Sequence, residues 1–281
     1  MITIGLAGWG DHPELYPAGI GAKHKLHTYS GHFPVVEVDS SFYAIPSIEQ
    51  YAKWDEATPE GFSFVVKAFQ GMTGHLRGPN PFSGNDEMYD YFKSTLEPLR
   101  KSDKLKAVLF QFPPWFDCSK PNVALLRAAR DRMGDVPVAL EFRHQSWFTA
   151  DMKDKTLDYM RQDGWIHSIC DEPQAGMGSI PIVPVATDEG LSIVRFHGRN
   201  VQGWNSSGSP DWRDVRYLYR YSDEELVEWK GIIENLEKTC CEVCVIFNNN
   251  SGGDASDNAK QLQQLLDLEW QGLAPRQLDL F

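Results

Sequence analysis

The chain has 281 residues, a length that fits either two average domains or one large α/β barrel. Hydrophobic residues make up 42% of it and charged residues 23%, as in ordinary globular proteins. The net charge of −12 argues against a nucleic-acid coat or a binder of anionic membranes, although a locally basic cleft remains open. We find no apolar run of membrane-spanning length and no signal-peptide pattern, so we expect a cytoplasmic protein without a membrane partner.

Eight stretches have the nearly continuous apolar composition of strands that are covered on both faces. The most informative is Val136 to Trp147, a buried strand that ends with Glu141 and Arg143 on one face. The other expected strands run from Ile2 to Gly8, Pro34 to Asp39, Phe62 to Phe69, Leu105 to Phe112, Trp165 to Asp171, Leu191 to His197 and Val243 to Asn250.

Helical patterns or long loops separate these strands. Ser47 and Ser222 suit the N-cap position, with Gln50 and Glu225 at the capping-box position. Two long loops, 70–85 and 200–214, follow the third and seventh strands, and loops of this length often bind ligands. The expected helices lie near Lys23 to His32, Ser47 to Glu56, Asp86 to Lys101, Ser119 to Met133, Thr149 to Asp163, Ser222 to Lys238 and Ala255 to Trp270.

The alternation of strands and helices implies parallel pairing, and eight units favour a closed barrel over an open sheet. We therefore predict the α/β class, with one (β/α)8 TIM-type barrel domain over residues 1–271 and long loops after strands 3 and 7. Residues 272–281 are expected to form an extended tail. The chain lacks both a G-x-G-x-x-G motif after the first strand and a P-loop, so neither NAD nor FAD is expected.

Five scattered cysteines, without an export signal, are expected to be reduced and mostly buried. The pair Cys241 and Cys244 has the spacing of half a zinc site, but no second pair or histidine set completes it.

Polar side chains gather where the predicted strands end, and in such barrels these ends build the active site. Four of them are acid–base groups and are candidate catalytic residues, namely Glu141, Asp39, His197 and Asp171. The candidate ligand-binding residues are Trp9, Lys67, His75, Gln111, Arg143, Arg195, Arg199, Trp204 and Asn249.

Three interpretations of these residues remain open. In the first they are structural, with Glu141–Arg143 and Glu37–Lys67 as buried ion pairs. In the second the cations bind an anionic or polyhydroxyl ligand while carboxylates and His197 transfer protons. In the third, carboxylates with His197 and His75 hold Mg²⁺ or Mn²⁺. Because nearby cations would repel a dication, we predict no metal ligand and leave the cofactor unknown.

The second long loop combines basic and aromatic residues as a stacking surface for bases or sugars does. Trp204 is expected to face the ligand. The segment 217–221 is expected instead to pack the loop onto the barrel.

The motifs at the strand ends resemble the YecE-like family, domain of unknown function 72. They are Val36-Glu-Val-Asp-Ser-Ser-Phe-Tyr43, Phe64 to Lys67, Gln111-Phe-Pro-Pro114, Glu141 to Trp147, Arg195-Phe-His-Gly-Arg199 and Asn248 to Asn250. The resemblance implies a TIM-type barrel distantly similar to those of xylose isomerase and endonuclease IV, but no reaction. Only His197 ends a strand here, so a three-zinc site is not expected. Asp39 stands where many relatives are expected to have Asn.

The last five residues, Gln277-Leu-Asp-Leu-Phe281, resemble the pentapeptide by which bacterial replication and repair proteins dock on the DNA sliding clamp. Leu280 and Phe281 would fill an apolar pocket, and Gln277 would hydrogen-bond its edge. Leu278 completes this candidate partner-binding set. The alternative is that these side chains fold back on the barrel.

The leading hypothesis is an enzyme, a hydrolase or isomerase, that acts on a phosphorylated, nucleotide-like or sugar-like ligand and is brought to DNA by its tail. The alternative is a non-catalytic adaptor that binds a ligand or the clamp. Substrate, oligomeric state and the assignment of acid and base stay open.

Overall fold

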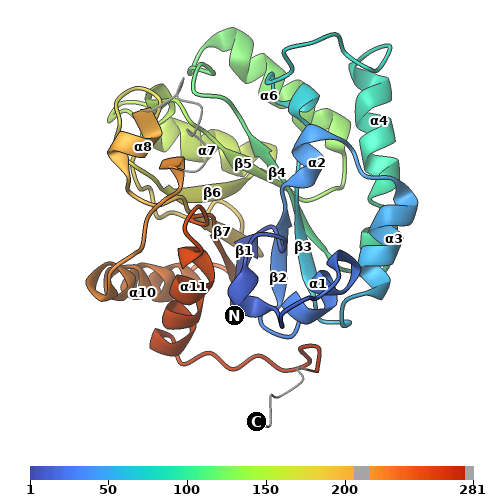
Figure 1. Cartoon of the computed structure of the whole chain (residues 1–281). Coiled ribbons are helices and arrows are strands. Elements are labelled where there is room, and N and C mark those ends of the chain that lie inside the picture. The colour runs from blue at the N-terminus through green and yellow to red at the C-terminus, as the bar shows by residue number, and fades with distance from the viewer. Residues whose placement is uncertain (206–214, 276–281) are drawn as a thin grey trace.

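The computed structural model describes residues 1–205 and 215–275, in which eight parallel strands close into a barrel in the order β1 to β8 (Figure 1). Each strand pairs with the next, and β8 pairs with β1, which leaves no open sheet edge. The predicted barrel is confirmed. The strands are β1 Ile2–Ala7, β2 Val35–Val38, β3 Ser63–Lys67, β4 Leu105–Gln111, β5 Val138–Glu141, β6 Ile166–Asp171, β7 Leu191–Phe196 and β8 Glu242–Phe247.

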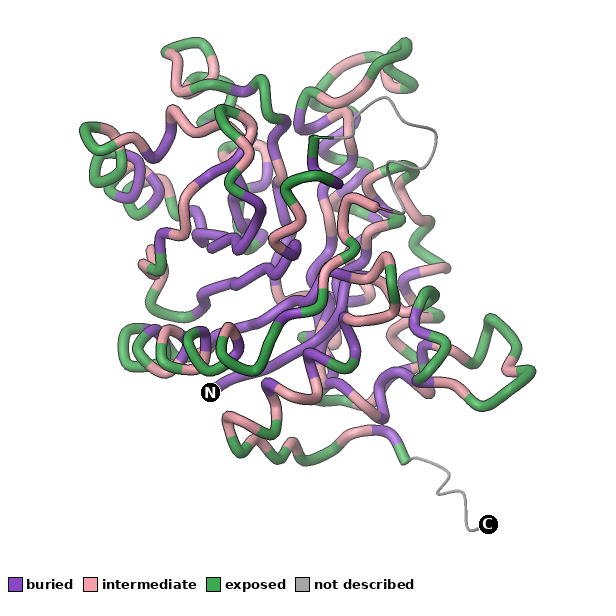
Figure 2. Tube along the Cα trace, turned by 60° about the vertical axis from the view of Figure 1, so that its left-hand side comes forward, coloured by how far each residue is buried: buried purple, intermediate pink, exposed green. Residues whose placement is uncertain are grey.

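Helices surround the barrel, with their apolar faces against the strands and their polar faces outward (Figure 2). None of the helices in the described ranges is long and apolar enough to cross a lipid bilayer. The α-helices are α1 Ala22–Tyr29, α2 Ser40–Tyr43, α3 Ile48–Glu56, α4 Asn85–Thr95, α5 Glu97–Lys101, α6 Lys120–Met133, α7 Lys153–Asp163, α8 Val201–Asn205, α10 Asp223–Glu237 and α11 Asp254–Leu265, and the short 3-10 helices are η1 Pro13–Leu15, η2 Gln70–Met72 and η3 Gln145–Trp147.

Three boundaries differ from those predicted. The helix expected over 86–101 is two helices, because Pro98 supplies no N–H for a continuous hydrogen-bond ladder and starts α5 afresh. The last helix ends at Leu265 rather than near Trp270. Between β6 and β7, residues 172–190 form a third long connection without a helix, besides the two predicted.

The interior of the barrel changes from apolar to charged along its axis. A compact apolar cluster that includes Val35, Leu109 and Ile193 fills the middle of the barrel. Gly5 lies where a Cβ atom would stand 2.0 Å from the Val35 carbonyl oxygen, so β1 and β2 approach too closely for any larger residue. Because side chains alternate along a strand, the positions two and four residues further along point into the same lumen. In β2 these later positions are the acidic Glu37 and Asp39, and in β7 they are Arg195 and His197.

The chain after α11 stays in contact with the barrel as far as Ala274. The Trp270 indole donates a hydrogen bond to the Ile2 carbonyl oxygen at 3.1 Å, and the Ala274 N–H donates to the Ser30 carbonyl oxygen at 3.1 Å. Both partners lie near the N-terminal ends of the strands. The division into a barrel domain over 1–271 and an extended tail over 272–281 stays a prediction.

Candidate active site

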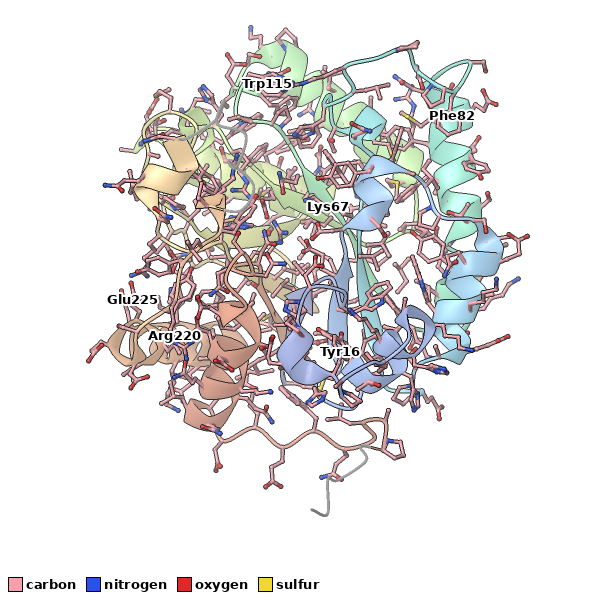
Figure 3. The ribbon with its side chains drawn as sticks, in the orientation of Figure 1. Tyr16, Lys67, Phe82, Trp115, Arg220 and Glu225 are labelled. Atoms are coloured by element: carbon pink, nitrogen blue, oxygen red, sulfur yellow. The ribbon has the colours of Figure 1, made fainter. Side chains whose placement is uncertain are left out.

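A cavity of about 830 Å³ opens at the C-terminal ends of the strands, and we call it the rim cleft. Figure 3 shows Lys67 at the upper end of β3 with Trp115 on the loop above it. The polar lining comes mainly from strand ends and the long loops, and consists of Asp11, Asp39, Lys67, His75, Arg77, Gln111, Arg143, Arg216, Tyr217, Asn248, Asn250 and Ser251.

Lys67 and Asp39 form an ion pair inside the rim cleft. Their Nζ and Oδ1 atoms lie 3.1 Å apart, and the side chains are 14% and 35% exposed. Burial acts to lower the pKa of Lys67, but Asp39 beside it raises that pKa above its usual value. Burial acts to raise the pKa of Asp39, but Lys67 and Arg195 lower it below its usual value. Both groups are therefore charged at neutral pH and available to a ligand.

Beneath the rim cleft, five buried residues form an alternating series of charges, which we call the buried charge chain. Its members in order are Glu37, Arg195, Glu141, Arg143 and Glu172. Arg195 Nε donates to Glu37 Oε2 at 2.8 Å, and Arg195 Nη1 bonds Glu141 Oε2 at 2.5 Å. Each guanidinium thus lies between two carboxylates, as buried charges require.

Glu141 is the central link of this chain. It is fully buried, and both of its oxygens accept hydrogen bonds, one from Arg143 and the other from Arg195 and Ser168. Burial acts to raise the pKa of Glu141, but the two guanidinium groups hold that pKa well below its usual range. This carboxylate is suited to orienting Arg143 rather than to exchanging protons.

Arg143 connects the buried charge chain to the rim cleft. Its Nε and Nη2 atoms lie 2.8 and 2.6 Å from Glu141 Oε1, Nη2 also lies 2.9 Å from His197 Nε2, and Nη1 donates to Glu172. A guanidinium has five N–H groups, and the contacts within residues 1–205 and 215–275 account for four of them, so the fifth belongs to Nη1. The direction of that hydrogen is fixed by the other four.

His197 is a neutral acceptor beneath the cleft. Burial and the neighbouring Arg143 and Arg195 guanidinium groups lower the pKa of His197 well below its usual value. Nε2 of His197 lies 2.9 Å from Arg143 Nη2, and Nδ1 lies 3.0 Å from Asn248 Nδ2. The Asn248 side chain also lines the rim cleft.

Two carboxyl groups of the buried charge chain have pKa values near neutrality. Burial raises the pKa of Glu37 to about 7 despite its contact with Arg195, and it raises the pKa of Glu172 to about 7 despite Arg143. Glu37 lies in β2 two residues before Asp39, which directly follows the strand. A carboxyl group that exchanges protons near pH 7, that of Glu37, therefore lies next to the carboxylate that lines the cleft, that of Asp39.

Aromatic side chains form much of the remaining wall. Phe42, Tyr43, Trp115 and Tyr217 line the cleft, and Tyr43 and Trp115 are 62% and 59% exposed. Trp204 lies over the Arg143 and Arg216 guanidinium groups, with 5.2 and 4.0 Å between ring centroid and guanidinium carbon. Trp212, which also belongs to the second long loop, lies outside the described residues.

The structure brings most predicted residues to this region. Asp39, Lys67, His75, Gln111 and Arg143 line the rim cleft. Glu141, Arg195 and His197 lie buried beneath it, and Trp204 covers Arg143.

Four predicted residues lie neither in the lining of the cleft nor among the residues that hold Arg143 beneath it. Asp171 lies on the outer face of β6, where it accepts hydrogen bonds from the Trp229 indole at 2.6 Å and from Arg199. Arg199 also bonds Glu225, on the α10 side of the molecule in Figure 3. Asn249 bonds the Tyr219 carbonyl and Asn258 at 2.9 and 3.0 Å. Trp9 packs edge-on against Trp54, with ring centroids 5.1 Å apart. These assignments to the site are corrected.

The alternation of side chains explains two of these corrections. The inward positions of β6 are Ser168 and Cys170, so Asp171 points outward. In β8 Ile246 belongs to the inner cluster, so Asn248 faces inward and Asn249 does not. Arg199 follows Gly198, whose φ of +81° turns the chain away from the lumen.

Sequence reasoning missed Glu172, Arg216 and Tyr217, which lie outside the regular strands where no periodicity assigns a direction. The presumed Glu37–Lys67 pair was also wrong, because Glu37 pairs with Arg195 and Lys67 with Asp39. Adjacency to the end of β6 was the one available signal for Glu172.

Glu141, Cys170 and His197 bring three potential metal-ligand atoms within 4.8 Å of one another in the described part of the chain. Two guanidinium groups already occupy the approach, since Arg143 and Arg195 lie 2.9 and 3.3 Å from His197 Nε2. Burial also raises the pKa of the Cys170 thiol well above its usual value. Because a dication would have to displace both arginines, this donor set does not fit a metal.

Comparisons with known proteins agree with the motif resemblance. Residues 3–279 match the family described as "Protein of unknown function DUF72". The chain is 58% identical to the UPF0759 protein YunF of Bacillus subtilis (strain 168), over 100% of both chains, and 28% identical to the UPF0759 protein YecE of Escherichia coli (strain K12), over 82% of both.

Solved structures agree as well. The crystal structure of a DUF72 family protein from Enterococcus faecalis V583 is 37% identical with a TM-score of 0.92, covering 99% of this chain and 100% of that one. A DUF72 family protein from Thermotoga maritima MSB8 is 31% identical with a TM-score of 0.82, covering 95% and 100%.

The central position of Glu141 predicts a large cost for its neutralisation. Glu141→Gln should lower the free energy of unfolding by about 3 kcal/mol, because the new amide group turns a donor toward a guanidinium and charge-assisted bonds are lost. Urea denaturation measures this change. The matched control Glu97→Gln affects an exposed ion pair and should change the same quantity by less than about 0.5 kcal/mol. Equal effects would contradict the role of Glu141.

Proposed function

This chain belongs to the DUF72 family, described as of unknown function, and we propose that it is an enzyme that binds a small anionic ligand in the rim cleft and moves a proton on it. The ligand carries a phosphate or carboxylate group. The observation that carries the proposal is that two cations from different strands, Lys67 and Arg143, line a single cavity.

The charges of the rim cleft support an anionic ligand. Its lining contains the cations Lys67, Arg77, Arg143 and Arg216 and the anions Asp11 and Asp39. A cleft with excess positive charge attracts anions even on a protein of net charge −12. Arg and Lys are the side chains that bind phosphate and carboxylate oxygens most effectively.

Asp39 is the proposed proton acceptor, since it is ionised and exposed in the cleft. A proton taken from the ligand by the Asp39 carboxylate passes to Glu37, whose pKa of about 7 allows it to hold and release a proton under neutral conditions. Lys67 and Arg143 stabilise the negative charge left on the ligand. An isomerisation by proton transfer begins with such a step, whereas in hydrolysis Asp39 would take the proton from the attacking water.

The aromatic wall supports a nucleotide-like or sugar-like part in the same ligand. Tyr43, Trp115 and Tyr217 offer ring faces and edges against which a base or sugar packs. The alternative, a non-catalytic binder, retains the cationic cleft but gives Asp39 and Glu37 no role.

We further propose that the C-terminal pentapeptide docks on a DNA sliding clamp. Gln277, Leu278, Leu280 and Phe281 lie outside the described residues, so the support is their sequence and where the described chain ends. Ala274 contacts Ser30 at the N-terminal ends of the strands, on the face opposite the rim cleft (Figure 1). Docking from that face would leave the cleft free.

Phosphate binding tests the role of the cleft. Lys67→Met should weaken the binding of inorganic phosphate at least about tenfold, because the phosphate loses its direct ion pair with the Lys67 ammonium group. Asp39→Asn should leave phosphate binding unchanged or tighter, because it removes a negative charge beside the anion. Isothermal titration calorimetry measures both affinities. The control Lys101→Met lies at an exposed surface position and should have no effect. Equal affinities for wild type and Lys67→Met would refute this site.

Removal of Leu280 and Phe281 tests the docking proposal separately. The truncated chain should lose its affinity for a purified bacterial sliding clamp in surface plasmon resonance, because the two apolar anchors are gone. Its affinity for phosphate should not change. Undiminished binding to the clamp after truncation would sink the docking proposal.

A further inference from the structure

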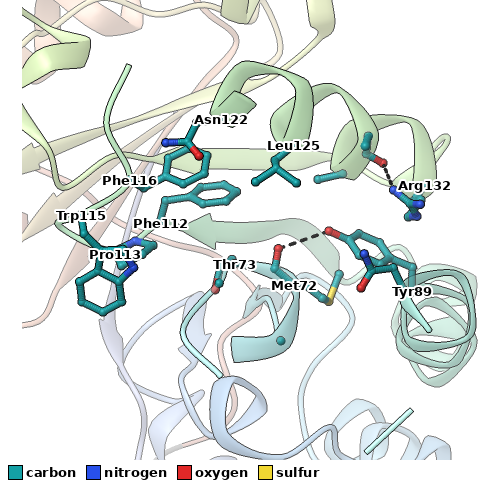
Figure 4. Close-up of a pocket in the computed structure, with 15 residues that line it drawn as sticks. Met72, Thr73, Tyr89, Phe112, Pro113, Trp115, Phe116, Asn122, Leu125 and Arg132 are labelled. Atoms are coloured by element: carbon teal, nitrogen blue, oxygen red, sulfur yellow. Dashed lines mark hydrogen bonds between the residues drawn. The ribbon is translucent and has the colours of Figure 1, made fainter. Parts of the chain in front are cut away.

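A second cavity, of about 320 Å³, lies next to the rim cleft between η2 and α4 on one side and α6 on the other (Figure 4). We call it the apolar slot. Its walls are mainly hydrophobic and include Met72, Tyr89, Phe112, Phe116 and Leu125. Its volume is at the lower end of the range for pockets that hold small organic ligands, about 300 to 1,000 Å³.

The two cavities share a thin wall. Trp115 lines both of them. In the loop after β3, Thr73 and Gly74 line the apolar slot while the next residue, His75, lines the rim cleft. Across this wall the His75 and Trp115 rings meet edge to face, with centroids 5.8 Å apart. The two cavities therefore adjoin at Trp115 and His75.

Two large hydrophobic side chains that line the slot are exposed to solvent, which favours an apolar ligand. Trp115 and Leu125 are 59% and 57% exposed, although each is large and hydrophobic. Within residues 1–205 and 215–275 the Trp115 indole has a ring contact with His75 but no hydrogen bond. Covering the two side chains would remove apolar surface from water, which is favourable.

Three polar side chains at the slot, those of Tyr89, Asn122 and Arg132, have hydrogen-bond partners in the protein. The Tyr89 hydroxyl donates to the Met72 carbonyl oxygen at 3.3 Å (Figure 4). Arg132 donates to Asp86 at 2.7 Å and to the Ala128 carbonyl oxygen at 3.1 Å. The Asn122 amide donates to Asp117. The slot therefore offers mainly apolar surface to an occupant, with Arg132 at one end (Figure 4).

We infer that the ligand of this protein is amphiphilic, with its anionic group in the rim cleft and a short apolar chain or ring in the apolar slot. This inference rests on the proposed function, since it takes the anion site as given. It specifies the substrate class further: a phosphate monoester or a carboxylic acid that also carries a small hydrocarbon-like chain or ring. Trp115 lies where the two parts of such a molecule join.

A series of alkyl phosphates tests the inference on the full chain. Methyl, butyl and hexyl phosphate carry the same anionic group and differ only in the length of the chain. Each buried methylene should tighten binding about fourfold until the slot is full. Isothermal titration calorimetry measures the affinities. An affinity that does not change from methyl to hexyl phosphate would overturn the inference while leaving the anion site intact.

Filling the slot supplies the matched control. Ala128 lines the slot from α6, so Ala128→Phe should remove most of the gain with chain length yet bind methyl phosphate as the wild type does. Ala124→Phe introduces the same side chain one turn earlier on α6, at an exposed position that does not line the slot, and should retain the full gain. If both variants retain the gain, the chain binds elsewhere and the inference is wrong.

Lys67→Met separates this inference from the proposed function. This substitution should weaken the binding of every alkyl phosphate by the same factor and leave the dependence of affinity on chain length unchanged. If methyl phosphate binding is insensitive to Lys67→Met, the anion site is wrong and the two-part ligand falls with it. Hexanol that binds as tightly as hexyl phosphate would have the same consequence, because the anionic group would contribute nothing.

Discussion

The site depends on the burial of five charged side chains in one continuous hydrogen-bonded series. Glu37, Arg195, Glu141, Arg143 and Glu172 alternate in sign, so each guanidinium has two carboxylate partners and the central carboxylate has two guanidinium partners. Removing any inner member leaves an uncompensated buried charge, whereas apolar side chains of similar volume would pack without that risk. Such an arrangement is therefore costly to keep for stability alone, and it makes sense as a rigid base for the groups above it.

That base divides the work between buried and exposed residues. Glu141 and His197 fix the orientation of Arg143, and only the outermost atoms of Arg143 and Asn248 reach the cleft. Asp39 and Lys67 are exposed enough to meet a ligand, and Glu37 links Asp39 to the buried series. The loops after β3 and β4 then supply His75 and Trp115, the aromatic side chains between the rim cleft and the apolar slot. The strands thus hold the charges, and the loops determine the shape of the ligand.

The sequence predicted the barrel because eight apolar strands alternating with helices leave few other arrangements. It also predicted which strand ends carry charge. It did not predict the partners, because these depend on the register between strands. In the barrel Val38 pairs with Val66, which brings Asp39 level with Lys67. Glu37 instead forms its ion pair with Arg195 across the lumen. The predictions for Asp171 and Asn249 were wrong because a shift of one residue along a strand moves a side chain to the opposite face of the sheet. Glu172 and Arg216 lie in segments without any period.

The most direct measurement is a crystal structure of the protein with bound inorganic phosphate. The account predicts the ion within hydrogen-bonding distance of both Lys67 Nζ and Arg143 Nη1, with Arg143 still bonded to Glu141, Glu172 and His197. Phosphate bound only outside the rim cleft, or an Arg143 side chain that leaves Glu141 to reach it, would contradict the claim that the buried charges hold a preformed anion site.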